Sequence, residues 1–363
     1  MSKVERLAST RSSMKTQTTK TSPSATSPDC AIPIFGICGF SGSGKTRLIA
    51  ALVQTFRQEG LRIAVIKQDA HGLDIDRPGK DTDVLFRAGA DVHIRDQEQS
   101  FFRSHDTPSL HETIHRLAPH YDLLLVEGHK SADLPHKVWL CKPGETALPP
   151  EASNISLTLP WDADRVAALL PLIRERLQAS LEEIPLYAGI LIGGKSARMG
   201  TPKHLLPAGE QTWLEQTIAT LAPHVAQCVI LGNGGLPPAA QHLPRLPDLP
   251  GQAGPLAGMR AAMRWGASAQ WVFCACDLPN IKAEAIAWLL AQRRPGIRAI
   301  LPQRPGKPHP EPLLAWYGPQ MAAALEQVSR PRDLASLPSV IRPEIPAALA
   351  PQWLNANTPA DIP

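Results

Sequence analysis

The 363-residue chain has few cysteines, few aromatic residues and little net charge. Its six cysteines form no C-x-x-C pair, so we expect reduced thiols rather than the disulfide framework of a secreted domain. No apolar run is long enough to cross a membrane. A net charge of +4 is too small to indicate a nucleic acid-binding surface. These absences predict a soluble, cytoplasmic protein that binds neither nucleic acid nor membrane.

The pattern of residues divides the chain into three parts. Residues 1–31 are rich in Ser, Thr and Lys and poor in large apolar side chains, which predicts a disordered tail. A pattern of apolar strands and amphipathic helices runs from 32 to 180, and a second begins at 185 and runs to 363. The chain therefore predicts two domains of α/β class, joined by a short linker over residues 181–185.

Apolar runs and capping residues define the expected elements. In the first domain we expect strands over 34–38, 62–66 and 122–126, and helices over 45–58 and 162–178. Asp162 is the expected N-cap of the second helix, and Pro171 predicts a kink within it. In the second domain we expect strands over 186–192, 227–231, 271–276 and 298–301, and a helix over 212–221.

A glycine-rich loop follows the first expected strand. Its sequence GFSGSGKT fits the pattern G-x-x-x-x-G-K-[ST], between a strand and a helix. Glycines at such positions let backbone N–H groups surround phosphate oxygens, and the helix N-terminus adds positive charge. The candidate nucleotide-binding residues are Gly39, Gly42, Gly44, Lys45 and Thr46, with the Thr46 hydroxyl also a candidate Mg²⁺ ligand. The alternative is a Gly/Ser-rich turn with no ligand.

Two further segments bear on this site. Glu127 ends an apolar strand, where a second group beside Mg²⁺ is required, although many buried strands end in an acid for structural reasons. The charged loop 74–82 either closes over a nucleotide or is an ordinary solvated loop.

The segments GFSGSGKT, VIKQDAHGLDIDRPGKDTD, RAGA and LLLVEGHK occur in this order over residues 33–178. Together they resemble the MobB family, small P-loop GTP-binding proteins of molybdenum cofactor maturation. The family often has His where this chain has Gln68. The resemblance implies a P-loop NTPase fold that binds GTP and Mg²⁺, hydrolyses GTP weakly and acts as an adapter.

A second basic glycine loop follows the first strand of the second domain. Gly193 and Gly194 are followed by Arg198 and Lys203. Glycines allow backbone N–H groups to approach a triphosphate, and two cations offset the charge that develops on departing pyrophosphate. The alternative for this spacing is an ordinary basic loop, since Gly-Gly loops are common.

Acidic residues follow two later apolar segments. Asp277 ends the run FCACD, where ligands bind in open α/β sheets, and is the first candidate for an Mg²⁺ ligand. The alternative is a turn formed by Asp277 with Pro279. Asp248 is a weaker candidate for the same metal, and the GPLAGM segment after it could pack beneath a base or ribose.

The segments LIGGKSARMGTPKHLL, GPLAGM, CDLP and NANTP lie within residues 186–363. They resemble the MobA family of molybdenum cofactor guanylyltransferases, which implies a Rossmann-like fold of the nucleotide-diphospho-sugar transferase type. By this resemblance, phosphates are held by Gly193, Gly194, Arg198 and Lys203, the nucleoside is contacted by Asn233 and Asp248, and Mg²⁺ is bound by Asp277. Pro202 and Ala275 depart from residues common in the family, and neither departure removes a charged group.

The two resemblances together predict a bifunctional protein that transfers GMP from GTP to molybdopterin, with Lys203, Arg198 and Asp277 as catalytic residues. They imply Mg²⁺ as cofactor, with molybdopterin-delivering proteins and molybdoenzymes as partners, and leave the oligomeric state open. A short linker would raise the mutual concentration of the domains to roughly millimolar, which predicts that the first assists delivery to the second. Two alternatives stay open: a cytidylyl- or sugar-nucleotidyltransferase fused to an NTPase, and a non-catalytic GTP-binding scaffold that delivers the pterin.

Overall fold

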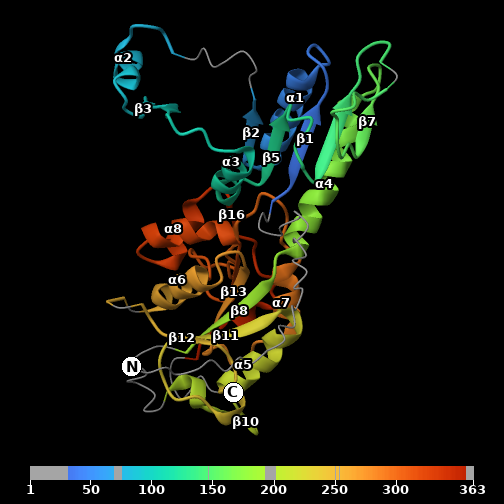
Figure 1. Cartoon of the computed structure of the whole chain (residues 1–363). Coiled ribbons are helices and arrows are strands. Elements are labelled where there is room, and N and C mark those ends of the chain that lie inside the picture. Colours follow the sequence, from blue (N-terminus) through green and yellow to red (C-terminus); the bar gives the residue numbers. More distant parts are fainter. Residues whose placement is uncertain are drawn as a thin grey trace, which may run out of the picture.

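A computed structural model describes residues 32–68, 76–145, 147–192, 202–249, 251–252 and 254–356 (Figure 1). The predicted tail 1–31, and with it Gly193, Gly194 and Arg198, lie outside the described residues. Within the described ranges, no helix has both the length and the apolar character needed to cross a membrane. The structure contains two main sheets, one in each half of the chain.

The first sheet is parallel and has the order β2-β5-β1-β6-β7. Its strands are β1 (Ile34–Cys38), β2 (Ile63–Lys67), β5 (Leu123–Glu127), β6 (His136–Leu140) and β7 (Leu157–Leu159). Helices α1 (Lys45–Gln58) and α4 (Arg165–Glu183) pack on one face, and α3 (Leu110–Leu117) packs on the other. Buried apolar residues on both faces explain why β1 and β5 are continuous apolar runs.

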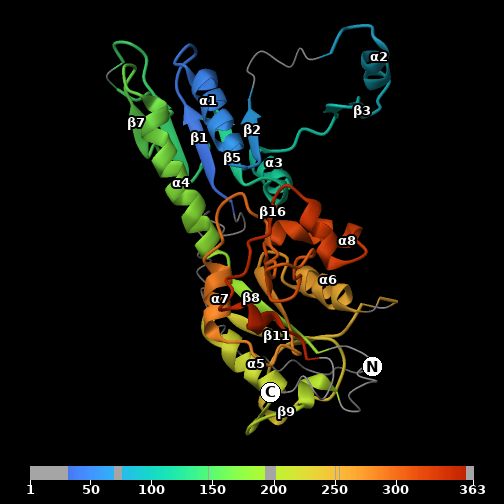
Figure 2. The same ribbon diagram turned by 180° about the vertical axis from the view of Figure 1, so that it is seen from behind.

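A small arm projects from this domain. It contains helix α2 (Asp81–Arg87) and an antiparallel hairpin of β3 (Val92–Arg95) and β4 (Ser100–Arg103). Figures 1 and 2 show the arm standing apart from both sheets. Its large apolar residues Val84, Leu85 and Phe102 are exposed, so it has little apolar core of its own.

The second sheet has seven strands in the order β12-β11-β8-β13-β15-β14-β16. They are β8 (Leu186–Leu191), β11 (Gln227–Leu231), β12 (Arg245–Leu246), β13 (Gln270–Ala275), β14 (Ala299–Ile300), β15 (Ala315–Tyr317) and β16 (Val340–Ile341). Strand β15 runs antiparallel to both of its neighbours. Helices α5 (Trp213–Leu221) and α7 (Ala283–Leu290) cover one face, and α6 (Pro255–Trp265) and α8 (Ala322–Gln327) cover the other. A two-stranded hairpin, β9 (Pro207–Ala208) with β10 (Gln211–Thr212), precedes α5.

The bounds of α4 differ from the prediction. The helix begins at Arg165, and its N-cap is Asp164, whose side chain accepts a hydrogen bond from the backbone N–H of Ala167. The prediction of Asp162 as N-cap was therefore wrong, because either aspartate fits the local pattern. Pro171 lies inside the helix, which continues to Glu183.

Helix α4 packs against the hydrophobic cores of both domains. Leu169, Ile173 and Leu177 are buried in the first domain, and Leu181 packs against the second. The buried side chain of Gln270, at the start of β13, donates hydrogen bonds to the carbonyl oxygens of Leu181 and Ile184. Most of the predicted linker is thus helical and fixed to the second sheet (Figure 1). The domain boundaries at 180 and 185 stay predictions.

We expect the side-chain amide of Gln270 to contribute measurably to the free energy of unfolding. Its oxygen also accepts hydrogen bonds from Trp316 Nε1 at 2.9 Å and Arg293 Nη1 at 3.0 Å. We expect Gln270→Leu to lower the free energy of unfolding by about 1–3 kcal/mol, because buried donors and acceptors lose their partners. Urea unfolding of the full chain measures this. Gln178→Leu, an exposed position on α4, is the matched control and should change stability by less than about 0.5 kcal/mol.

A buried ion pair makes a second connection between the two halves. Arg298 Nη2 lies 3.4 Å from Asp122 Oδ1, with about 9% of each side chain exposed. The same nitrogen is 3.3 Å from the carbonyl oxygen of His120. Asp122 also accepts a hydrogen bond of 2.7 Å from the backbone N–H of Arg62, so the pair lies against the start of β2.

Candidate functional site

Backbone conformation makes glycine necessary in the loop between β1 and α1. Gly39, Gly42 and Gly44 have φ angles of 145°, 79° and 88°, a region that favours glycine. A Cβ atom on Gly39 would lie 2.5 Å from Ser43 Oγ and 2.7 Å from the carbonyl oxygen of Leu140. The loop therefore keeps the tight turn that a phosphate-binding loop requires.

Lys45 lies against this loop. Its Nζ donates hydrogen bonds to the carbonyl oxygens of Gly39 at 2.9 Å and Phe40 at 3.0 Å. The ammonium group is thus held beside the N-terminus of α1, where the helix dipole also favours an anion.

The structure brings together the two residues predicted to flank Mg²⁺ in the first domain. Thr46 Oγ1 donates to the carboxylate of Glu127, with distances of 3.1 Å to Oε1 and 3.3 Å to Oε2. Glu127 is buried, 8% exposed, at the end of β5. Carboxylate and hydroxyl oxygens are ligands that Mg²⁺ accepts, so this pair fits the metal.

Sequence patterns did not indicate a role for Arg165, the first residue of α4. Its guanidinium donates to the carbonyl oxygens of Ser43 at 2.6 Å, Cys141 at 2.5 Å and Pro160 at 2.9 Å. It therefore ties the glycine loop to the loops after β6 and β7. Because Arg165 is 122 residues from Ser43 in the chain, no local spacing could have revealed it.

The second site lies at the carboxyl edge of the second sheet. Strands β12, β11, β8 and β13 are adjacent and parallel, so the loops that follow them meet at one edge. Asn233 follows β11, Asp248 follows β12, and Asp277 follows β13. Asn233 is exposed and Asp248 is half-buried.

Lys203 and Asp277, 74 residues apart in sequence, form an ion pair at this edge. Lys203 Nζ lies 2.9 Å from Asp277 Oδ2, and 20% and 17% of the two side chains are exposed. The other carboxylate oxygen, Oδ1, is buried and has no hydrogen-bond partner among the described residues. A buried acceptor without a partner is costly, and a cation such as Mg²⁺ would satisfy it. The residues present therefore fit a metal.

Two family models match the chain. The first, Molybdopterin guanine dinucleotide synthesis protein B (MobB), matches residues 34–157, and the second, MobA-like NTP transferase domain, matches residues 188–346. A molybdopterin-guanine dinucleotide biosynthesis adapter protein of Haemophilus influenzae is 31% identical over 165 residues, covering 44% of this chain and 88% of that protein. A probable molybdenum cofactor guanylyltransferase of Pelotomaculum thermopropionicum is 32% identical over 183 residues, covering 48% of this chain and 88% of that protein.

The chain belongs to both families. It joins a MobB-like domain to a MobA-like nucleotidyltransferase domain, as the two resemblances predict. A molybdenum cofactor biosynthesis bifunctional protein of Synechocystis is 30% identical over 146 residues, which cover 39% of this chain and 42% of that protein.

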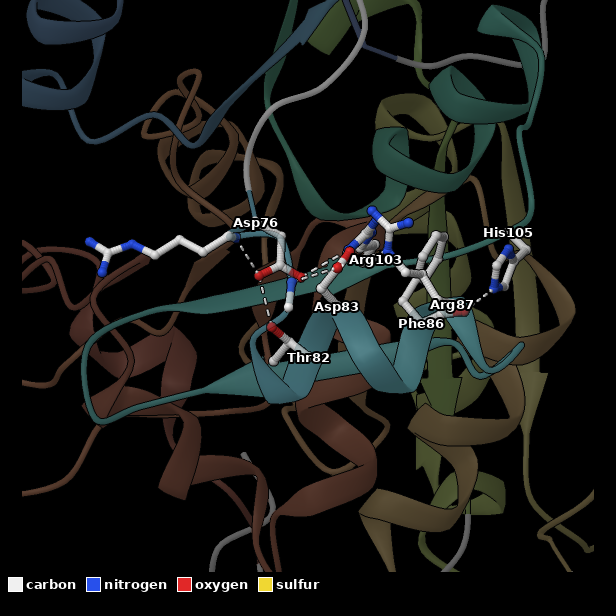
Figure 3. A network of polar contacts seen from close by, with 9 residues as sticks. Asp76, Thr82, Asp83, Phe86, Arg87, Arg103 and His105 are labelled. Atoms are coloured by element: carbon white, nitrogen blue, oxygen red, sulfur yellow. Dashed lines mark hydrogen bonds and ion pairs between the residues drawn. The ribbon is translucent and has the colours of Figure 1, made fainter.

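The arm contains a polar network (Figure 3), which includes Gly79 of the PGKD segment and Arg87 of the RAGA segment. Asp83, 4% exposed, accepts hydrogen bonds from the backbone N–H of Gly79 at 2.9 Å, Arg87 Nε at 2.8 Å and Arg103 Nη1 at 3.2 Å. The Gly79 N–H and then the two guanidinium groups hold the pKa of Asp83 below its ordinary value. Arg103 also pairs with Asp76 at 2.9 Å.

The remaining contacts of this network also lie within the arm. The Thr82 hydroxyl donates to Asp76 at 2.8 Å, and the rings of Phe86 and His105 stack with centroids 3.9 Å apart (Figure 3). Residues 74 and 75 lie outside the described residues, and both alternatives for the loop 74–82 stay open. Within the described part, Asp76 and Thr82 make their polar contacts inside the arm.

The GPLAGM segment of the MobA-like domain has a packing role. Gly258 lies within α6, and a Cβ atom there would be 3.1 Å from Leu231 Cβ and 3.2 Å from Leu191 Cδ2. Glycine thus lets α6 approach β8 and β11 closely, directly behind the loops of the second site.

Four cysteines, Cys38, Cys228, Cys274 and Cys276, are buried, and Cys141 is half-buried. Five are free thiols in the structure, and Cys30 lies outside the described residues. Burial raises the pKa of Cys228 to about 11 and that of Cys276 to about 12, so both thiols stay protonated at neutral pH.

Proposed function

We propose that the MobA-like domain transfers GMP from GTP to the terminal phosphate of molybdopterin and releases pyrophosphate. The observation that carries this proposal is the Lys203–Asp277 pair at the carboxyl edge of the sheet, with one buried carboxylate oxygen directed to no protein group among the described residues. The names of the relatives, an adapter protein of molybdopterin-guanine dinucleotide biosynthesis and a guanylyltransferase, supply the substrates.

In this reaction an oxygen of the terminal phosphate of molybdopterin forms a bond to the α-phosphorus of GTP. The bond from that phosphorus to the bridging oxygen breaks, and pyrophosphate leaves with the electron pair. The attacking phosphate is already an anion at neutral pH, so no strong general base is required. Catalysis then depends on in-line positioning and on charge stabilisation. Lys203 and Arg198 would stabilise the negative charge that develops on pyrophosphate.

The other predicted residues complete the nucleotide site. Gly193 and Gly194 would direct backbone N–H groups at the phosphates, and Asn233 and Asp248 would contact the nucleoside. Asp277 would hold Mg²⁺, which neutralises phosphate oxygens when bound.

For the MobB-like domain we propose GTP binding with weak hydrolysis and an adapter role in the cytoplasm. Lys45 and the glycines of its loop would hold the phosphates, and Thr46 with Glu127 would hold Mg²⁺. Its protein partners would deliver molybdopterin or accept the finished cofactor. The geometry of the glycine loop and the Thr46–Glu127 pair support this part of the proposal.

One experiment tests the proposal against both alternatives. The purified full chain is incubated with molybdenum-loaded molybdopterin, Mg²⁺ and GTP, CTP or ATP in separate reactions, and product masses and pyrophosphate are measured. We expect the guanine dinucleotide and an equal amount of pyrophosphate with GTP alone. Preferential use of CTP would indicate a cytidylyltransferase, and bound pterin without pyrophosphate would indicate a scaffold.

A further inference from the structure

His204 is buried next to the proposed catalytic residue Lys203. The proposed reaction assigns it no function. His204 directly follows Lys203 in a short 3₁₀ turn over Lys203–Leu205 and is only 2% exposed. Its Nδ1 is buried and has no hydrogen-bond partner among the described residues, so the contact made by Nε2 shows which part of the domain the ring fixes.

The imidazole contacts the loop that follows β11. His204 Nε2 lies 2.8 Å from the carbonyl oxygen of Gly235. A carbonyl oxygen only accepts, so Nε2 carries the hydrogen and donates it. The neighbouring Gly234 has a φ of 153°, and a Cβ atom on it would lie 3.1 Å from His204 Cε1. The loop thus lies directly on the ring and requires glycine there.

The same loop is also fixed at its other end. The backbone N–H of Gly232 donates to the carbonyl oxygen of Leu246 at 2.9 Å, and Arg245 Nε donates to the carbonyl oxygen of Gly232 at 3.0 Å. Asn233, the proposed nucleoside contact, therefore lies between a segment held by β12 and a segment held by His204. Its side chain is exposed at the carboxyl edge of the sheet.

We propose that His204 is a positioning residue that fixes the Asn233 loop relative to Lys203, so that one nucleotide is bound at its base and its phosphates together. This inference rests on the proposed function, since it assigns nucleoside recognition to that loop. The observation behind it is that one residue is attached to both segments: His204 directly follows Lys203 in the chain, and its ring is hydrogen-bonded to Gly235 at 2.8 Å.

The expected effect falls on nucleotide binding and selectivity. Without the imidazole N–H, the Gly235 carbonyl loses its donor and the loop is no longer ordered before binding, so binding must order it. The loss of one buried hydrogen bond of about 1 kcal/mol corresponds to a change of roughly 5- to 10-fold in affinity. The hydrogen bond of His204 goes to Gly235, and not to Lys203 or Asp277, so kcat should change much less than KM.

The test compares His204→Leu with His204→Gln in the full chain. Leucine fills similar volume without a donor, whereas the glutamine amide can still donate toward Gly235. For His204→Leu we expect KM for GTP to rise roughly 5- to 10-fold and the preference for GTP over ATP to fall by a similar factor. His204→Gln should stay within about 3-fold of the native chain in both quantities.

Other outcomes overturn the inference. A purely structural histidine would lower the yield of active protein and the apparent kcat in both variants, with KM and base preference unchanged. If the native chain forms no product, the proposed function fails, and GTP titration then tests His204 separately. In that titration, the step that Lys203→Ala weakens is GTP binding to the transferase pocket. The inference fails if His204→Leu leaves the affinity of this step unchanged.

Discussion

Asp277→Asn is expected to lower kcat for GMP transfer by about 10²-fold or more, with a smaller change in KM for GTP. Asparagine keeps the size of the side chain and one acceptor oxygen, but it removes the charge that pairs with Lys203 at 2.9 Å and that would hold Mg²⁺. Pyrophosphate release in the presence of molybdopterin and saturating GTP measures this loss. Glu284→Gln, which neutralises an exposed carboxylate in the first turn of α7, is the control and should keep native turnover.

Lys203→Ala should have an effect of the same order, since it removes a charge that acts on the departing phosphates. Because the two groups are in contact, their effects should not add: the double variant should lose less than the product of the two single losses. Near-native turnover in both single variants would defeat the assignment of this pair, and full additivity would show that the two groups act independently.

The structure brings Glu127 to Thr46 and Asp277 to Lys203, and the pairing of parallel strands explains both contacts. The roles of these residues in nucleotide binding and catalysis stay predictions. Glu127 is 81 residues from Thr46, but β5 pairs with β1 in a register that places Glu127 beside Ile37, at the entrance to the glycine loop. Asp277 similarly follows β13, which is paired with β8, and the chain after β8 leads to Lys203. A strand followed by a polar residue is visible in sequence, and parallel pairing then brings such residues to one edge.

Other features depend on contacts that no local pattern encodes. Arg165 is one of many arginines on amphipathic helices, and only the folded chain places its guanidinium on the carbonyl oxygens of the glycine loop. Strand β15 has three residues and runs antiparallel, and its place between β13 and β14 follows from tertiary packing. Asp162 and Asp164 offer the same capping chemistry, and which of them caps α4 depends on how the preceding loop packs.

The course of α4 bears on how the two domains cooperate. Its first residue contacts the glycine loop of the MobB-like domain, and its last turn is hydrogen-bonded to Gln270 at the start of β13. Figure 1 shows α4 running from the first sheet to the second. A helix of 19 residues is about 28 Å long, and the transferase site lies at the far, carboxyl ends of β8 and β13. Helix α4 and strand β8 thus lie between the two sites along the chain. That this short connection lets the first domain assist delivery to the second stays a prediction.

Lys45→Ala is expected to weaken GTP binding by the MobB-like domain by about 10- to 100-fold, because hydrogen bonds to charged groups contribute about 1.5–3 kcal/mol. The ammonium group is held by the carbonyl oxygens of Gly39 and Phe40, at the N-terminus of α1, and is therefore placed before any nucleotide arrives. GTP titration of the full chain, resolved into two binding steps, measures the loss. The transferase step is recognised as the one that Lys203→Ala weakens.

Arg57→Ala is the matched control for Lys45→Ala. Arg57 is an exposed cation in the last turn of the same helix, so its removal changes the net charge equally without touching the glycine loop. If long-range charge attraction alone drew GTP to this domain, both variants would weaken binding to a similar degree, and the effect would fade with added salt. A loss confined to Lys45→Ala that persists at moderate ionic strength would establish direct contact with the phosphates. If Lys45→Ala bound GTP as tightly as the native chain, the glycine loop would not be the binding site for the GTP phosphates.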